Sequence, residues 1–178
     1  MKRHVLMIPS WFDMDKLDGV FIFGHARMTA SLGGRTGLIY VAQSSSFQHS
    51  EPEWHNDQGV QYVILRRWHL PKLPMLSWMW KQQYYRLFKQ YVSRYGTPDI
   101  LHAHGYLAGI ITRDISKQTG IPYVVTEHNT SIPGGTVRWY HKNALRRVYR
   151  DASALIAVSD FLSRAMRQWT SRSDLHVI

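Results

Sequence analysis

Short apolar segments alternate along the chain with longer segments in which apolar residues recur every three or four positions. The short runs are typical of buried strands, and the 3–4 spacing is typical of helices. Strands are expected at residues 5–8, 37–42, 59–65, 99–103, 121–126, 154–158 and 175–178. Helices are expected at residues 20–32, 75–95, 106–119, about 137–150 and, after a Ser159-Asp160 cap, to about residue 169. The polar residues 43–57 are expected to form a loop.

This order of elements predicts an α/β fold. Strands that are apolar nearly throughout and are separated by helices indicate a Rossmann-like parallel sheet with helices on both faces. A chain of 178 residues suffices for one self-supporting core, so residues 1–178 are expected to form a single domain. The chain stops inside an expected strand, as though it were the first half of a longer protein.

The composition narrows the class of protein. The absence of cysteine excludes a disulfide scaffold, an iron–sulfur site and a thiolate zinc finger. No apolar run approaches the ~18 residues that a membrane-spanning helix needs. Pro9 ends the apolar stretch after the basic start too early for a secretory signal. We therefore expect a cytoplasmic chain that begins at its native N-terminus.

The net charge of +10 predicts an anionic partner. Nucleic acid, an anionic membrane surface and phosphorylated substrates all fit such a charge. The motifs GxGxxG, GxxxxGK[ST], GxSxG and HExxH are all absent from the sequence. Interpretations as a dehydrogenase or a P-loop protein therefore lose their main support.

Three loops lie where an open parallel sheet binds its ligands, beyond the carboxyl ends of the strands. They are residues 10–18, 104–105 and 127–135. Gly19 stands directly before an expected helix, where the missing side chain would let a phosphate approach backbone N–H groups. An ordinary turn is the alternative for Gly19.

Two sequence features resemble metal ligands. Asp13 and Asp15 form an Asp-x-Asp sequence in a polar loop, and His102 and His104 project the same way from one strand. The first match is only three residues long, and no cysteine or carboxylate near the histidines completes a ligand set. No metal site is expected.

The segment at residues 123–131 carries the clearest candidate chemistry. A buried apolar strand runs directly into five consecutive polar residues, where a cleft is expected. His128 lies among them and can donate or accept a hydrogen bond near neutral pH. A structural histidine is the alternative interpretation.

These segments, in this order, resemble the N-terminal half of the GT-B glycosyltransferases, specifically the retaining family 4. The likeness rests on Asp-Ile-Leu-His-Ala-His at residues 99–104 and on Gly-Ile-Pro at 120–122, which leads through Val-Val-Thr to His128. It continues through Ala-Leu-Ile-Ala-Val-Ser at 154–159. The family usually continues from a strand like residues 176–178 into a second domain.

The resemblance implies roles for individual residues. His128 is similar to the family's catalytic histidine, which contacts the donor sugar and the developing transition state. Gly19 resembles the glycine near the donor pyrophosphate. Four further residues would lie toward the acceptor: Ser10, Trp11, His104 and Asn129.

The resemblance also implies a reaction. A sugar would pass from a nucleotide-sugar donor to an acceptor hydroxyl with anomeric retention, and the acceptor would be a lipid-linked or cell-envelope glycan. No cofactor or metal is implied, because helix ends and basic side chains usually stabilise the diphosphate in this fold. The nucleotide-binding second domain is absent from this chain, so the chain alone is expected to be inactive.

Residues 60–98 hold no acidic side chain, seven Lys or Arg and nine of the 23 aromatic residues. On the expected helix, an aromatic stripe at 3–4 spacing lies apart from basic residues, which fits either a core-facing helix or a helix at a membrane surface. The candidate membrane-surface residues are Arg66, Arg67, Lys81, Arg86, Lys89 and Arg94. A second basic cluster comprises Arg138, Lys142, Arg146, Arg147 and Arg150. Binding at the inner face of the cell membrane is the sharper hypothesis.

Two alternatives remain open from the sequence. One is a non-catalytic module that binds an anionic polymer or membrane surface through its basic, aromatic residues. No nucleic-acid-binding fold is recognisable, and the aromatic residues follow helical spacing, so nucleic acid is not the expected partner. The other keeps the GT-B architecture with a different reaction, that of a phosphorylase or a sugar epimerase.

Overall fold

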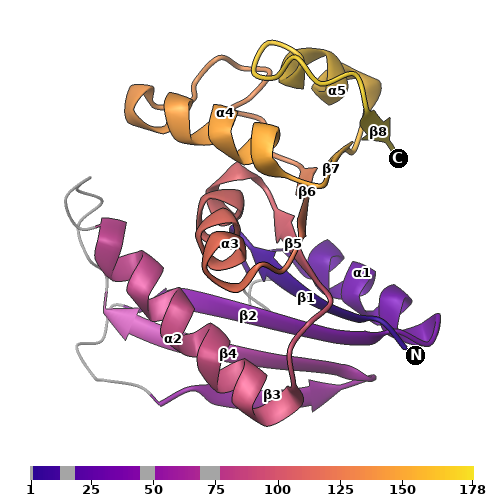
Figure 1. Cartoon of the computed structure of the whole chain (residues 1–178), viewed down its shortest axis with the longest axis vertical. Helices are drawn as coiled ribbons and strands as arrows, with labels where there is room; N and C mark the ends of the chain where they lie inside the picture. The colour runs from indigo at the N-terminus through magenta and orange to yellow at the C-terminus, as the bar shows by residue number, and fades with distance from the viewer. Residues whose placement is uncertain (1, 13–18, 45–50, 69–76) are drawn as a thin grey trace. The chain divides into compact units, whose positions relative to one another are not determined.

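The computed structural model describes residues 2–12, 19–44, 51–68 and 77–178 (Figure 1). The chain divides into two compact units, residues 1–99 and residues 100–178. Each unit carries helices packed on β-strands that are mostly parallel. The expected α/β, Rossmann-like class is confirmed.

The first unit contains a sheet in the order β3-β4-β2-β1 across its described residues. Three parallel strands, β1, β2 and β4, pair as β1–β2 and β2–β4, and β3 pairs antiparallel with β4. The strands are β1 (His4–Pro9), β2 (Arg35–Ser44), β3 (Glu53–Asp57) and β4 (Val60–Trp68). The helices are α1 (Val20–Ser31) and α2 (Ser77–Tyr95).

The second unit is described throughout and holds four parallel strands in the order β5-β6-β7-β8. The strands are β5 (Ile100–His104), β6 (Tyr123–Glu127), β7 (Ala154–Ala157) and β8 (Leu175–Val177). The helices are α3 (Tyr106–Thr119), the 3-10 turn η2 (Trp139–His141), α4 (Lys142–Asp151) and α5 (Asp160–Met166).

The expectation of a loop over residues 43–57 is wrong at both of its ends. Residues 43–44 continue β2, and Glu53–Asp57 forms β3. Four of the five residues in β3 are polar and its last three are exposed, because the strand pairs on one side only. An edge strand of this kind lacks the apolar pattern by which strands are recognised in sequence.

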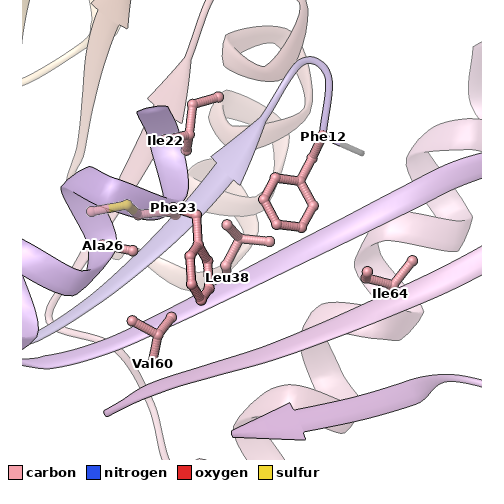
Figure 2. Close-up of a cluster of buried hydrophobic side chains, with 8 residues drawn as sticks. Phe12, Ile22, Phe23, Ala26, Leu38, Val60 and Ile64 are labelled. Carbon is pink, nitrogen blue, oxygen red and sulfur yellow. The ribbon is translucent and has the colours of Figure 1, made fainter. Parts of the chain in front are cut away.

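The helices α1 and α2 cover opposite faces of the first unit's sheet. Leu38 of β2 packs in a cluster with Ile22 and Phe23 of α1 (Figure 2). Its neighbour Gly37 faces Tyr91 of α2. Since successive strand residues point to opposite faces, the two helices lie on either side of the sheet.

The aromatic stripe of α2 faces the core. Tyr84, Leu87, Phe88 and Tyr91 are buried. The Tyr91 hydroxyl lies 2.8 Å from Nε2 of His4, a buried hydrogen bond between α2 and β1. The aromatic residues of the stripe therefore complete the fold of the first unit.

Gly37 is required by the close approach of α2. A Cβ atom at residue 37 would lie 1.8 Å from the Tyr91 hydroxyl oxygen. We expect Gly37→Ala to lower the free energy of unfolding by about 2 kcal/mol or more, because Tyr91 would have to move and leave His4. Urea denaturation measures the change.

Gly24→Ala is the matched control. Gly24 lies at an exposed position of helix α1, and a Cβ atom there would meet nothing within 4 Å. This change should raise the free energy of unfolding by roughly 0.5–1 kcal/mol, since alanine favours helix more than glycine. Equal stability of the two alanine variants would contradict the close packing of α2.

Candidate functional site

The candidate site of the second unit lies at the carboxyl ends of β5 and β6. The two strands are parallel and pair His104 with Thr126. The backbone N–H of Gly105 donates to the carbonyl of Thr126 at 2.8 Å. This pairing places the residues that follow β5 beside those that follow β6.

Two histidines from these strand ends form a hydrogen-bonded pair. Nδ1 of His104 and Nε2 of His128 lie 3.1 Å apart, and the two rings are stacked with their centroids 5.4 Å apart. His104 is fully buried, whereas His128 is half-buried. One ring must donate while the other accepts, so the intact pair can carry at most one positive charge.

A third histidine, His102, stacks against His104. It projects from β5 on the same side as His104, and the ring centroids are 4.3 Å apart. Its Nε2 atom lies 2.7 Å from the hydroxyl oxygen of Thr126. Nε2 of His102 and Nδ1 of His104 are therefore both engaged in hydrogen bonds.

Asn129 shapes the loop that carries His128. Its side-chain oxygen accepts a hydrogen bond from the backbone N–H of Ser131 at 2.8 Å, which makes a local turn. Its own backbone N–H donates to Glu127 at 2.9 Å. The half-buried Asn129 thus holds the loop beside His128.

Glu127 is a residue of this site that the sequence interpretation missed. It ends β6, is fully buried and accepts hydrogen bonds from the backbone N–H groups of His128 and Asn129. The Tyr149 hydroxyl of α4 also donates to it, at 2.9 Å. Burial raises the pKa of Glu127 to about 7, although these donors favour the ionised form.

One sequence signal could have revealed Glu127. Tyr123, Val125 and Glu127 alternate along β6 and so share a face, the face on which Tyr123 donates to Val148 of α4. A carboxylate in an otherwise buried series needs hydrogen-bond donors. The alternation along β6 therefore predicts that Glu127 is buried and hydrogen-bonded and is not a solvated loop residue.

The predicted residues of the first unit lie at the carboxyl end of β1. Ser10 and Trp11 follow this strand, and the Trp11 ring lies 6.2 Å from that of Phe21. Gly19 directly precedes α1 with a φ of 72°, and a Cβ atom there would lie 2.7 Å from the Trp11 carbonyl oxygen. Backbone conformation and packing therefore both require glycine at position 19.

The structure thus brings the predicted residues together in two groups. Ser10, Trp11 and Gly19 form one group in the first unit. His104, His128 and Asn129 form the other in the second unit. The Asp13 and Asp15 candidates lie outside the described residues.

The predicted membrane-surface residues lie on two elements. Arg66 and Arg67 belong to β4, and Arg66 forms an ion pair with Glu53 at 3.0 Å. The remaining four lie on α2: Lys81, Arg86, Lys89 and Arg94. The Arg94 guanidinium lies over the Trp54 ring at 4.8 Å.

The described helices include none that is both long enough and apolar enough to cross a membrane. Helix α2 instead separates buried aromatic residues from exposed Arg86, Lys89 and Arg94.

Comparison with known proteins assigns the family. A family model described as "Glycosyl transferase 4-like domain" matches residues 26–178. The chain therefore belongs to this family of glycosyltransferase domains, as the sequence motifs indicate. A search of curated protein sequences finds no significant match.

Solved structures confirm the fold. Sucrose-phosphate synthase from Thermosynechococcus elongatus is similar with a TM-score of 0.73 at 12% identity, over 99% of this chain and 48% of that one. A trehalose-6-phosphate structure from E. coli bound with UDP-2-fluoro glucose has a TM-score of 0.60 at 10% identity, over 93% and 42%. Arabidopsis thaliana UGT89C1 complexed with UDP-L-rhamnose has a TM-score of 0.56 at 14% identity, over 98% and 48%.

These similarities define the fold as the N-terminal half of a GT-B glycosyltransferase. The chain spans about half the length of each of these three structures.

The raised pKa of Glu127 predicts a pH-dependent stability. A carboxyl group whose pKa is higher in the folded state stabilises the protein most at low pH, and this contribution is lost as the pH rises. The free energy of unfolding of the wild type, relative to Glu127→Gln, should fall between about pH 4.5 and 7 and then level off. The expected slope is about 1.4 kcal/mol for each pH unit.

Asp174→Asn provides a control of opposite sign. The bond from Arg172 lowers the pKa of Asp174 to about 2, so its contribution is lost only in acid. The stability difference between wild type and this variant should stay constant from pH 5 to 8. A wild-type curve parallel to that of Glu127→Gln over the same range would refute the raised pKa of Glu127.

Proposed function

We propose that this chain is the acceptor-side half of a retaining glycosyltransferase that moves a sugar from a nucleotide-sugar to an acceptor hydroxyl. The observation that carries the proposal is the His104–His128 pair at the carboxyl ends of β5 and β6 in a glycosyl transferase 4-like domain. The nucleotide-sugars in two similar structures, UDP-2-fluoro glucose and UDP-L-rhamnose, support this donor class.

His128 is the proposed catalytic residue. It is half-buried, and its ring is stacked on and hydrogen-bonded to the ring of His104. A hydrogen bond from this ring to the donor sugar would hold the anomeric carbon in place and strengthen as charge develops. Asn129 and His104, with Ser10 and Trp11 of the first unit, are assigned to the acceptor side.

Gly19 is the proposed neighbour of the donor diphosphate. It precedes the first turn of α1, where backbone N–H groups and the helix dipole favour an anion. Such N–H groups, together with basic side chains, would stabilise the departing diphosphate without a metal or another cofactor. This role comes in addition to the packing against Trp11 that already requires glycine.

A second domain is part of the proposal. The chain spans 48% of the sucrose-phosphate synthase structure. The rest of a GT-B enzyme would supply most contacts to the nucleotide and close the cleft over the sugar. We therefore expect transfer only from the complete enzyme.

The proposed acceptor is lipid-linked or part of a cell-envelope glycan, met at the inner face of the cell membrane. The net charge of +10 and the exposed cations of α2 support attraction to anionic lipid, at roughly 1 kcal/mol for each Lys or Arg. Trp78 at the start of α2 is 61% exposed and suits a membrane interface. The aromatic stripe itself is buried and would not contribute.

Replacement of His128 tests the catalytic role. His128→Ala in the complete enzyme should lower kcat for sugar transfer by about 100-fold or more, since it removes a hydrogen bond made at the reacting sugar. Binding to membranes should not change. His176→Ala is the matched control, because His176 is exposed on β8. Unchanged turnover in His128→Ala would remove His128 from the mechanism.

Sedimentation with liposomes tests the membrane surface. The triple change Arg86→Gln, Lys89→Gln and Arg94→Gln should weaken binding to phosphatidylglycerol liposomes, and added salt should weaken wild-type binding steeply. In the control variant, three positive charges are removed instead from Arg3, Arg27 and Lys117, which are exposed and lie outside α2. Equal loss in both triple variants would mean that total charge, rather than α2, drives binding.

An assay of nucleotide release by the complete enzyme distinguishes the alternative function. A basic module without catalysis would bind anionic liposomes or polymers yet release no nucleotide from any nucleotide-sugar. Sugar transfer by the complete enzyme would exclude that alternative.

A further inference from the structure

The carboxyl group of Glu127 joins three parts of the second unit. Oε1 accepts hydrogen bonds from the backbone N–H groups of His128 at 3.1 Å and Asn129 at 2.9 Å. Oε2 accepts one from the Tyr149 hydroxyl at 2.9 Å. The backbone N–H of Tyr106 is a fourth donor. A single buried group thus contacts the loop after β6, the first turn of α3 and helix α4.

The contact with α3 has a physical reason. Helix α3 follows Gly105, which has no side chain to cap the helix. The first N–H groups of a helix need acceptors, and the helix dipole favours a negative charge at that end. Glu127 supplies both from the neighbouring strand, and Gly105 directly follows His104.

The same contacts fix the loop of His128 from both sides. Two backbone N–H groups of the loop bind Glu127, and Asn129 closes a turn onto Ser131. Tyr106, at the start of α3, also donates its backbone N–H to Glu127. The main chain of His128 is therefore held relative to α3 and β5, which sets the distance between the His104 and His128 rings.

We propose that Glu127 is the positioning residue of this site, whose buried carboxylate holds the His128–Asn129 main chain, the start of α3 and Tyr149 in the one arrangement that aligns His128 with the donor sugar. The inference rests on the proposed transferase function. Glu127 acts through His128 and does not itself touch the substrate.

Ionisation of Glu127 governs this arrangement. The carboxylate has lone pairs for all four donors, whereas the neutral acid carries a proton that needs an acceptor of its own. The titratable groups that act on it are Tyr149 from α4 and Tyr106 from α3. His128 contacts it through the backbone N–H. Burial brings its pKa to about 7, so the fully bonded form prevails above neutral pH.

The experiment records backbone amides and turnover in the complete protein from pH 5 to 9. Labelling with ¹⁵N-histidine and ¹⁵N-asparagine makes the amides of His128 and Asn129 visible by NMR. Both amides should titrate together near pH 7, because each donates to the carboxyl group of Glu127. Turnover with a nucleotide-sugar should rise over the same pH interval.

Glu127→Gln is the decisive variant, because glutamine keeps the shape and one acceptor oxygen but cannot ionise. The common amide titration should vanish, and kcat should fall about tenfold to a hundredfold because His128 is less well placed. The pH dependence of turnover near 7 should flatten. Retention of full turnover, or wild-type amides that do not move between pH 5 and 9, would overturn the inference.

Tyr149→Phe is the matched second variant. It removes one donor and leaves the carboxyl group and both amides in place. Since the Tyr149 hydrogen bond lowers the pKa of Glu127, its loss should move the amide titration to higher pH. A shift to lower pH would contradict the inferred contact.

The two proposals fail in different ways. No turnover of any nucleotide-sugar by the wild type, with the common amide titration present, would refute the transferase and support Glu127 as the group that holds the loop. Full turnover by Glu127→Gln would leave the transferase standing and refute the positioning role.

Discussion

The candidate site depends on one buried carboxyl group, that of Glu127. Glu127 ends β6 and is fully buried, so its carboxyl group needs hydrogen-bond donors from the protein. The donors come from α3, α4 and the loop after β6. The hydrogen bonds of this buried group therefore fix the positions of α3, α4 and the loop after β6 relative to one another. We infer that this arrangement places His128 within hydrogen-bonding distance of His104.

Much of the fold could be predicted because its signals are local. Buried parallel strands such as β1 and β7 lie in continuous apolar runs, and α3 is marked by Gly105 before it and Gly120 after it. The strand β3 was not predicted because it lies at the edge of the sheet and consists mainly of polar residues. The burial of the α2 stripe depends on Gly37, a residue far away in sequence whose missing side chain admits Tyr91.

The site could be predicted in part. His104, His128 and Asn129 follow strand ends, and parallel pairing brings strand ends together, so their proximity follows from position in the chain. Glu127 could not be assigned in this way. Its importance comes from Tyr149, which lies 22 residues away and reaches it only once α4 has packed on β6. Gly19 differs from Glu127 in that the sequence suggested a ligand-binding role for it. The structure adds a second reason for glycine there, the close approach of the Trp11 carbonyl oxygen.

The most direct test of the account follows the His128 ring by NMR while the complete protein binds UDP-glucose, UDP-N-acetylglucosamine or GDP-mannose. We predict that the nucleotide-sugar that binds will shift the ring signals of His128, and that the matching nucleotide diphosphate alone will leave them in place. This result would place His128 at the sugar rather than at the nucleotide. Binding of a nucleotide-sugar that leaves the His128 ring unchanged would contradict the account.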